Sequence, residues 1–148
     1  MRHMGPSLLA AGLLMSSTGA APAAVLTVEG GDVSLLVSSA TAGQELVPVV
    51  DQSSSGLKYR RLSADPTVKV TAATDLASPL FTLKVEAVEV GDGNPTTEIT
   101  LGTTAQDLIT NITTVTFVTS CLRYTSVALL SDGVGTDAHT VTYTIVAE

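Results

Sequence analysis

Apolar and polar residues alternate along several short stretches of the chain, and each stretch is bounded by turn-forming residues. In the stretch VKVTA, Val68, Val70 and Ala72 share one side, and Lys69 and Thr71 share the other. A period of two residues is typical of a strand with one buried face, and such alternation favours antiparallel pairing. Because these stretches recur about every ten residues, they predict an all-β sandwich or barrel of about seven to nine strands.

Other segments are apolar or alternating enough to form strands. In FTLKVEAVEV the apolar parity changes between Ala87 and Val88, which predicts a β-bulge there. Pro48 indicates an edge strand or a break, since proline cannot donate to a ladder. The segment VTFVTSCLRYTSVALL is either one long strand or two strands joined by a bulge at Ser120-Cys121. The predicted segments are 32–39, 44–50, 57–62, 81–90, 97–101, 115–130 and 139–148.

The segment TTAQDLITNI, residues 103–112, is the one stretch with a helical pattern. Thr104 is placed to cap a helix, and an acidic residue follows three positions later, as in a capping box. Leu108, Ile109 and Ile112 form an apolar stripe at helical spacing. We therefore expect a short helix between two strands.

The first 23 residues have the layout of a secretory signal peptide. Arg2 provides a positive start, residues 7–15 form a short apolar core, and Ala21-Pro22-Ala23 has the small-x-small form of a cleavage site. A membrane-spanning helix needs about 20 apolar residues, more than this run offers. We predict a secreted protein, with residues 1–23 as signal peptide, residues 24–148 as a single domain and no membrane span in the mature chain.

The chain is acidic, with seven Lys and Arg residues against fourteen Asp and Glu residues. Loss of Arg2 with the signal peptide leaves six cations and a net charge of −8. This balance argues against nucleic acid as a partner, because such affinity comes mainly from neutralising phosphates. It also argues against anionic membrane surfaces and fits a soluble extracellular protein.

Two segments carry a resemblance to a known group of proteins. The residues LKYRRLSADPTVKVTAAT, 57–74, resemble the early strand pair of small secreted bacterial immunoglobulin-like domains, such as fimbrial subunits and proteins of the spore-coat-U type. The ending GTDAHTVTYTIVAE, 135–148, resembles their polar loop and Thr-rich last strand. The resemblance implies an antiparallel immunoglobulin-like β-sandwich with a structural role. Many fimbrial subunits carry a disulfide, whereas Cys121 is the only cysteine here.

Two loops rich in Asp, Asn and Gly offer oxygen ligands of the kind that calcium prefers. They are GDGNP, residues 91–95, and SDGVGTDA, residues 131–138, which we expect to be a hairpin loop before the last strand. The spacing differs from that of an EF-hand loop, and the same residue types are ordinary turn formers. The calcium candidates are Asp92, Asn94, Asp132 and Asp137.

The sequence KYRRL holds the one cationic cluster of the chain. Lys58 and Arg60 share a strand face, Arg61 follows, and Lys69 is expected on the neighbouring strand. This patch is either a contact for an acidic partner or another subunit, or an outer sheet face on which cations discourage edge pairing.

No catalytic residue, cofactor or enzymatic activity is predicted. After signal removal, Cys121 and His139 are the one nucleophile and base combination, and such a pair needs a hydrogen bond and a third orienting group. One Cys and one His cannot fill a four-ligand zinc site. A lone cysteine is expected either to be buried as a small apolar residue or to pair with another chain.

The two ends of the mature chain are candidates for strand exchange between copies. Residues 24–39 begin with a short apolar segment and a Gly30-Gly31 break, and such a segment can add to the sheet edge of a neighbour. An unpaired apolar edge is a liability, so we expect both end strands to pair within their own domain.

The sequence as a whole predicts a secreted, non-enzymatic structural or surface-assembly protein, pilin-like or coat-like, whose partners are itself or other surface proteins. The alternative is a monomeric extracellular binding module that uses loops 91–95 and 131–138, with calcium binding as its most specific version.

Overall fold

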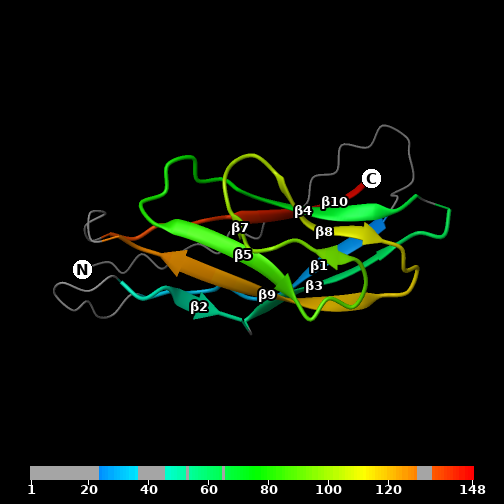
Figure 1. Ribbon diagram of the computed structural model, residues 1–148, viewed down its shortest axis with the longest axis horizontal. Helices are drawn as coiled ribbons and strands as arrows, with labels where there is room; N and C mark the ends of the chain where they lie inside the picture. Colours follow the sequence, from blue (N-terminus) through cyan, green and yellow to red (C-terminus); the bar gives the residue numbers. More distant parts are fainter. Residues whose placement is uncertain (1–23, 37–45, 53, 65, 130–134) are drawn as a thin grey trace, which may run out of the picture.

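The computed structural model describes residues 24–36, 46–52, 54–64, 66–129 and 135–148, and the predicted signal peptide, 1–23, lies outside them. Within these residues the chain forms ten strands and no helix (Figure 1). In the same residues no helix is long and apolar enough to cross a membrane. The strands are β1 Ala24–Gly30, β2 Val49–Asp51, β3 Ser55–Arg61, β4 Val68–Thr74, β5 Thr82–Val88, β6 Asn94–Pro95, β7 Ile99–Thr100, β8 Gln106–Ile112, β9 Val118–Val127 and β10 Val141–Ala147.

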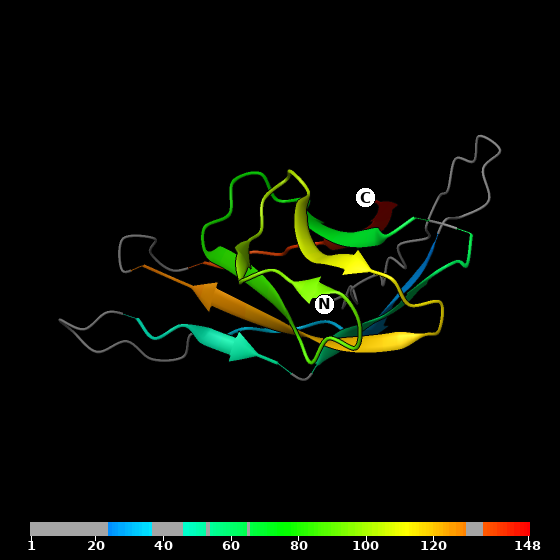
Figure 2. The same cartoon turned by 45° about the vertical axis from the view of Figure 1, so that its right-hand side comes forward.

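The strands form two antiparallel sheets that lie face to face. Sheet A has the order β1-β3-β9-β5-β7, with β2 also paired to β9, and sheet B has the order β10-β4-β8-β6. Figures 1 and 2 show β10, β4 and β8 in the layer above β9, β3 and β1. The predicted all-β antiparallel sandwich is therefore confirmed.

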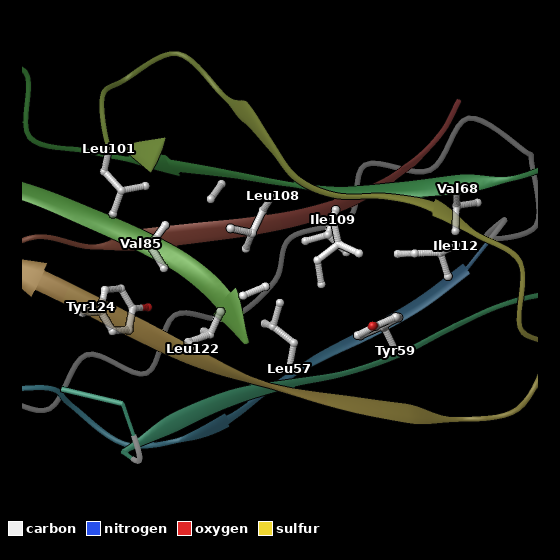
Figure 3. Packing of buried hydrophobic residues seen from close by; sticks show 13 residues of the cluster. Leu57, Tyr59, Val68, Val85, Leu101, Leu108, Ile109, Ile112, Leu122 and Tyr124 are labelled. Carbon is white, nitrogen blue, oxygen red and sulfur yellow. The ribbon is translucent and has the colours of Figure 1, made fainter. Parts of the chain in front are cut away.

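The core lies between the two sheets, where the alternating apolar side chains meet. Leu57 of β3 and Leu122 of β9 point from sheet A toward Leu108 and Ile109 of sheet B (Figure 3), and all four are fully buried. Val68, the first inward residue of the VKVTA stretch, is also fully buried, as its alternation predicts. Burying one such side chain contributes roughly 1.5–3 kcal/mol relative to leaving it in water.

The predicted helix at 103–112 is wrong, because residues 106–112 form β8 and residues 103–105 precede it without helical structure. Val68 pairs with Ile112, Val70 with Ile109 and Thr71 with Asp107, so β8 carries one extra residue in each interval. These two bulges let Leu108, Ile109 and Ile112 all face the core, although strict alternation would separate them. The apolar spacing that predicted a helix is therefore produced by a strand with two bulges.

The bulge predicted at Ala87-Val88 is also wrong. The pairing of β5 with β9 keeps one register from Thr82 opposite Val127 to Val88 opposite Cys121. The strand ends at Val88, and Glu89, with φ of 53°, turns the chain away from the sheet. The segment around Ser120-Cys121 is one continuous strand, β9.

The predicted strand at 32–39 is absent from its described part, 32–36, and residues 37–39 lie outside the described residues. Pro48 directly precedes the three-residue β2, which, within the described residues, pairs with one neighbour, the C-terminal part of β9.

From β3 to β10, each strand lies in the sheet opposite to that of the strand before it. Chain connections that alternate between the two sheets are typical of jelly rolls. The two-layer arrangement of the sheets is the one that immunoglobulin-like domains also have. The hairpin predicted for 131–138 is therefore wrong, since β9 belongs to sheet A and β10 to sheet B. Both end strands pair within the chain, β1 with β3 and β10 with β4, as expected.

Candidate functional site: the free sheet edges

The two calcium-candidate loops lie at opposite ends of the sandwich. The β5–β6 loop lies where β8 ends, because the Asp92 carboxylate accepts hydrogen bonds from the backbone N–H groups of Thr113 at 2.7 Å and Thr114 at 3.0 Å. Asp137 lies at the other end, where one of its carboxylate oxygens accepts a 2.7 Å bond from the backbone N–H of Phe81. Both side chains are therefore structural acceptors in this arrangement.

The other calcium candidates do not complete a site with them. Asn94 lies in β6, and its backbone carbonyl accepts a hydrogen bond from Thr110 at 3.4 Å. Asp132 lies outside the described residues. No group of three or more His, Cys, Asp or Glu side chains in the described ranges is arranged to hold a metal ion. The two loops also cannot form one contact surface, because the length of the sandwich separates them.

The predicted cationic patch is divided between the two sheets. Lys69 lies on β4 in sheet B, where its ammonium is 2.8 Å from a carboxylate oxygen of Asp107. Arg61, at the end of β3, donates from Nε to the backbone carbonyl of Thr113. Lys58 and Arg60 remain together on the outer face of sheet A.

Lys58 and Arg60 share one aromatic neighbour, Phe117, which directly precedes β9. The Lys58 ammonium lies 5.3 Å and the Arg60 guanidinium 4.4 Å from the centre of its ring. Phe117 is 45% exposed, and cations over an exposed ring gain about 0.5–1 kcal/mol. Nε of Arg60 is shielded from solvent and has no hydrogen-bond partner. Neither cation has a described carboxylate within ion-pair distance.

The opposite half of this outer face is neutralised by internal ion pairs. Arg123 of β9 pairs with Glu86 directly across on β5. The Lys84 ammonium lies 3.3 Å from a Glu98 carboxylate oxygen. A hydrogen bond from Thr125, together with Lys84, holds the pKa of Glu98 below its usual range. The net positive charge on sheet A therefore gathers beside β1, on β3.

The Cys121 and His139 pair is not assembled. Cys121 is half-buried on the outer face of sheet A, so the first of its two alternatives, a fully buried apolar residue, is wrong, and its thiol lies 3.5 Å from a Glu89 carboxylate oxygen. That hydrogen bond raises the pKa of the thiol, which makes it a poorer nucleophile. His139 precedes β10, with Nδ1 3.0 Å from the Thr74 hydroxyl.

The sandwich has two margins that differ in how they end. At the blunt side, formed by β6 and β7, each edge strand has two residues, and β6 contains Pro95. At the open side, formed by β1 and β10, each edge strand has seven residues. Glu29 is the one charged residue in those two strands. Short strands, prolines and charges are the common protections of an edge, so the open side is the less protected one.

The open side is joined to the core by a pair of tyrosines. The hydroxyls of Tyr124 on β9 and Tyr143 on β10 lie 2.5 Å apart, across the gap between the sheets. Burial raises the pKa of both phenols, and for Tyr143 the neighbouring Tyr124 raises it further. Both phenols therefore ionise at a higher pH than free tyrosine does.

Little in the amino-acid sequence indicates these free edges. Nothing in the sequence marks Phe117 as exposed or β1 and β10 as neighbours at one margin. Comparison with known proteins finds no matching family model, curated protein or solved structure. The likeness to fimbrial and spore-coat-U proteins therefore stays a prediction.

Proposed function

We propose that this protein is a secreted, non-enzymatic structural subunit that assembles at the cell surface through the free edges of its sheets. The observation that carries the proposal is the contrast between the two margins. The blunt side ends in two-residue strands, whereas the open side presents two seven-residue strands with a single charge.

A free edge supports assembly because its backbone N–H and C=O groups lack strand partners and can pair with another chain. The composition of β10 adds to this, since Val141–Ala147 contains no charge, proline or glycine. The overall acidity favours solubility between assembly events, because net charge opposes non-specific association.

The test compares the mature chain, residues 24–148, with edge-protected variants. Light scattering after gel filtration, at increasing protein concentration, should show oligomers whose proportion grows with concentration. Lysine placed on the open side, by Thr27→Lys in β1 together with Thr144→Lys in β10, should reduce that proportion.

The matched control is Thr82→Lys in β5, another exposed strand threonine, toward the blunt side. This variant should assemble like the wild type. A wild-type protein that stays monomeric at every concentration, and is missing from surface fractions of the cells that secrete it, would refute the proposed function.

A further inference from the structure

Near its end, β1 carries an apolar side chain, Val28, that the protein's own fold leaves uncovered. Val28 lies directly opposite Leu57 of β3, so it belongs to the inner side of sheet A. Ala24 and Leu26, on that same side, pack against the core, whereas Val28 is 53% exposed. The inner side of β1 therefore has room for one more apolar neighbour.

The outer side of β1 has unpaired charges of both signs nearby. Glu29 of β1, like Asp32 just beyond it, forms no side-chain hydrogen bond or ion pair in the described part of the chain. On the adjacent strand β3, Lys58 and Arg60 lack carboxylate partners, as described above. Glu29 lies opposite Gly56, whereas Arg60 lies opposite Val25, four residues away along β1. Four strand residues span roughly 13 Å, so one chain cannot pair Glu29 with Arg60.

We infer that β1 pairs antiparallel with β1 of a second copy, about a two-fold axis at Thr27, so that the two A sheets form one continuous sheet. This inference rests on the proposed function and names the edge that assembly uses. Pairing centred on Thr27 places inner residues opposite inner residues, so that the inner sides of both copies face the same way. It is also the one such register in which all seven residues, Ala24 through Gly30, have a partner in the second copy.

The same register gives a partner to the exposed Val28 side chain and to the Glu29 carboxylate. Val28 comes to lie opposite Leu26 of the second copy, which covers its exposed inner surface. Glu29 of the second copy comes to lie opposite Val25, and Val25 is itself opposite Arg60 on β3, so the three residues form one row across the joined sheet. The carboxylate is then about two strand spacings, roughly 10 Å, from Arg60, a range over which surface charges still interact.

The β10 edge fits a second copy less well. The cation beside it, Lys69, is already paired with Asp107. The carboxylate of Glu148, the residue after β10, accepts a hydrogen bond from the backbone N–H of Asn111 at 3.0 Å. No unsatisfied pair of opposite charges therefore lies at β10 in the described residues, and charge complementarity favours β1.

Disulfide trapping tests the register. In a Cys121→Ser background of residues 24–148, Thr27→Cys should form a covalent dimer under mild oxidation, because the two-fold axis places this position opposite itself. Val25→Cys and Glu29→Cys should each form no disulfide-linked dimer alone and should cross-link when mixed, because the two positions face each other across the axis. Thr144→Cys, at an exposed position of β10, is the matched control and should not cross-link.

A charge exchange tests the electrostatic part without any cysteine. Glu29→Arg and Arg60→Glu should each weaken dimerisation about threefold, since each places two pairs of like charges roughly 10 Å apart in every dimer, a distance at which salt screens most of the repulsion. The double variant restores opposite charges and should recover most of the affinity. Sedimentation equilibrium provides the dissociation constants, and circular dichroism confirms that each variant is folded.

The outcomes separate this inference from the proposed function. If oligomers form but Thr144→Cys cross-links and Thr27→Cys does not, the β1 pairing is overturned and the structural role stands. The same conclusion follows if the charge variants leave the dimerisation affinity unchanged. A strictly monomeric wild type would overturn both.

Discussion

The blunt side and the open side of this sandwich are held by different kinds of contact. At the blunt side, Thr96, just after β6, donates to the backbone carbonyl of Asp107 at 2.9 Å, and at the adjoining end of the sandwich Asp92 secures the β5–β6 loop to the start of the β8–β9 loop. At the open side, β1 and β10 depend on their backbone ladders and on the contact of Tyr143 with Tyr124. One margin is thus closed by side chains of the same chain, and the other is left able to accept a partner.

The difference suggests a division between stability and association. Substitutions at the blunt side should lower the free energy of unfolding, because they break loop contacts that nothing else replaces. Substitutions at the open side should cost less stability and act mainly on assembly. The predictions below test this division, from the largest expected effect to the smallest.

Gly93→Ala should destabilise the fold by about 3 kcal/mol, since it combines backbone strain with overpacking. Gly93 has φ of 98°, and an added Cβ would lie 2.8 Å from both Cγ2 of Ile109 and the carbonyl oxygen of Thr110. Urea denaturation measures the change. Gly102→Ala, where an added Cβ meets nothing within 4 Å, is the control and should be nearly neutral. Equal effects at the two glycines would contradict the tight packing of the blunt side.

Asp92→Asn should cost about 2 kcal/mol, because the carboxylate accepts charge-assisted bonds from two backbone N–H groups, those of Thr113 and Thr114. The same denaturation measurement applies. Asp32→Asn, at a carboxylate without such bonds in the described residues, should leave stability within about 0.5 kcal/mol of the wild type. A loss of the same size in both variants would argue for a general charge effect.

Tyr143→Phe should cost about 1 kcal/mol near neutral pH, because it removes the hydroxyl contact with Tyr124. The folded-state pKa of both tyrosines is raised, so the folded protein favours the neutral phenols. Their contribution is complete below the ordinary pKa of about 10 and is lost as the pH rises above it. Wild-type stability should therefore fall more steeply above pH 10 than that of the variant. Parallel curves would show that Tyr143 does not titrate with unfolding.

The smallest effect is expected at the start of β10. A hydrogen bond from the backbone N–H of Thr140 lowers the pKa of Asp75. A lowered pKa means that this contact stabilises the fold above the ordinary value of about 4 and is lost as the pH falls through the folded-state value. The protection factor of the Thr140 amide, which is the exchange rate relative to the intrinsic rate at the same pH, should fall on acidification, and Asp75→Asn should remove that dependence. Unchanged protection at low pH would exclude the contact.

Much of the fold could be predicted where the signal was local. The alternation in 68–74 identified β4 with its buried face, and GDGNP identified the turn after β5, because strand period and turn chemistry depend on adjacent residues. The errors came from non-local effects. β8 looked helical because its bulges are set by its register with β4, and the last loop looked like a hairpin because adjacent strands usually pair.

The candidate site was the less predictable part. Lys58 and Arg60 were correctly grouped, since residues two apart share a strand face. Lys69 was wrongly joined to them, because no local pattern says that β3 and β4 belong to opposite sheets. The exposed Phe117 could not be recognised either, because exposure depends on what packs above a residue.

By itself the sequence determined that this protein would form two layers of extended chain, because its alternating side chains can be buried only between facing sheets. It also determined the turn at Gly93 and the acidity of the surface. Only the tertiary structure decided which strands became neighbours, which cations kept no partner, and that both long edges fell at one margin. Strand order is set by contacts between residues far apart in the chain, and such contacts exist only once the whole sandwich has closed.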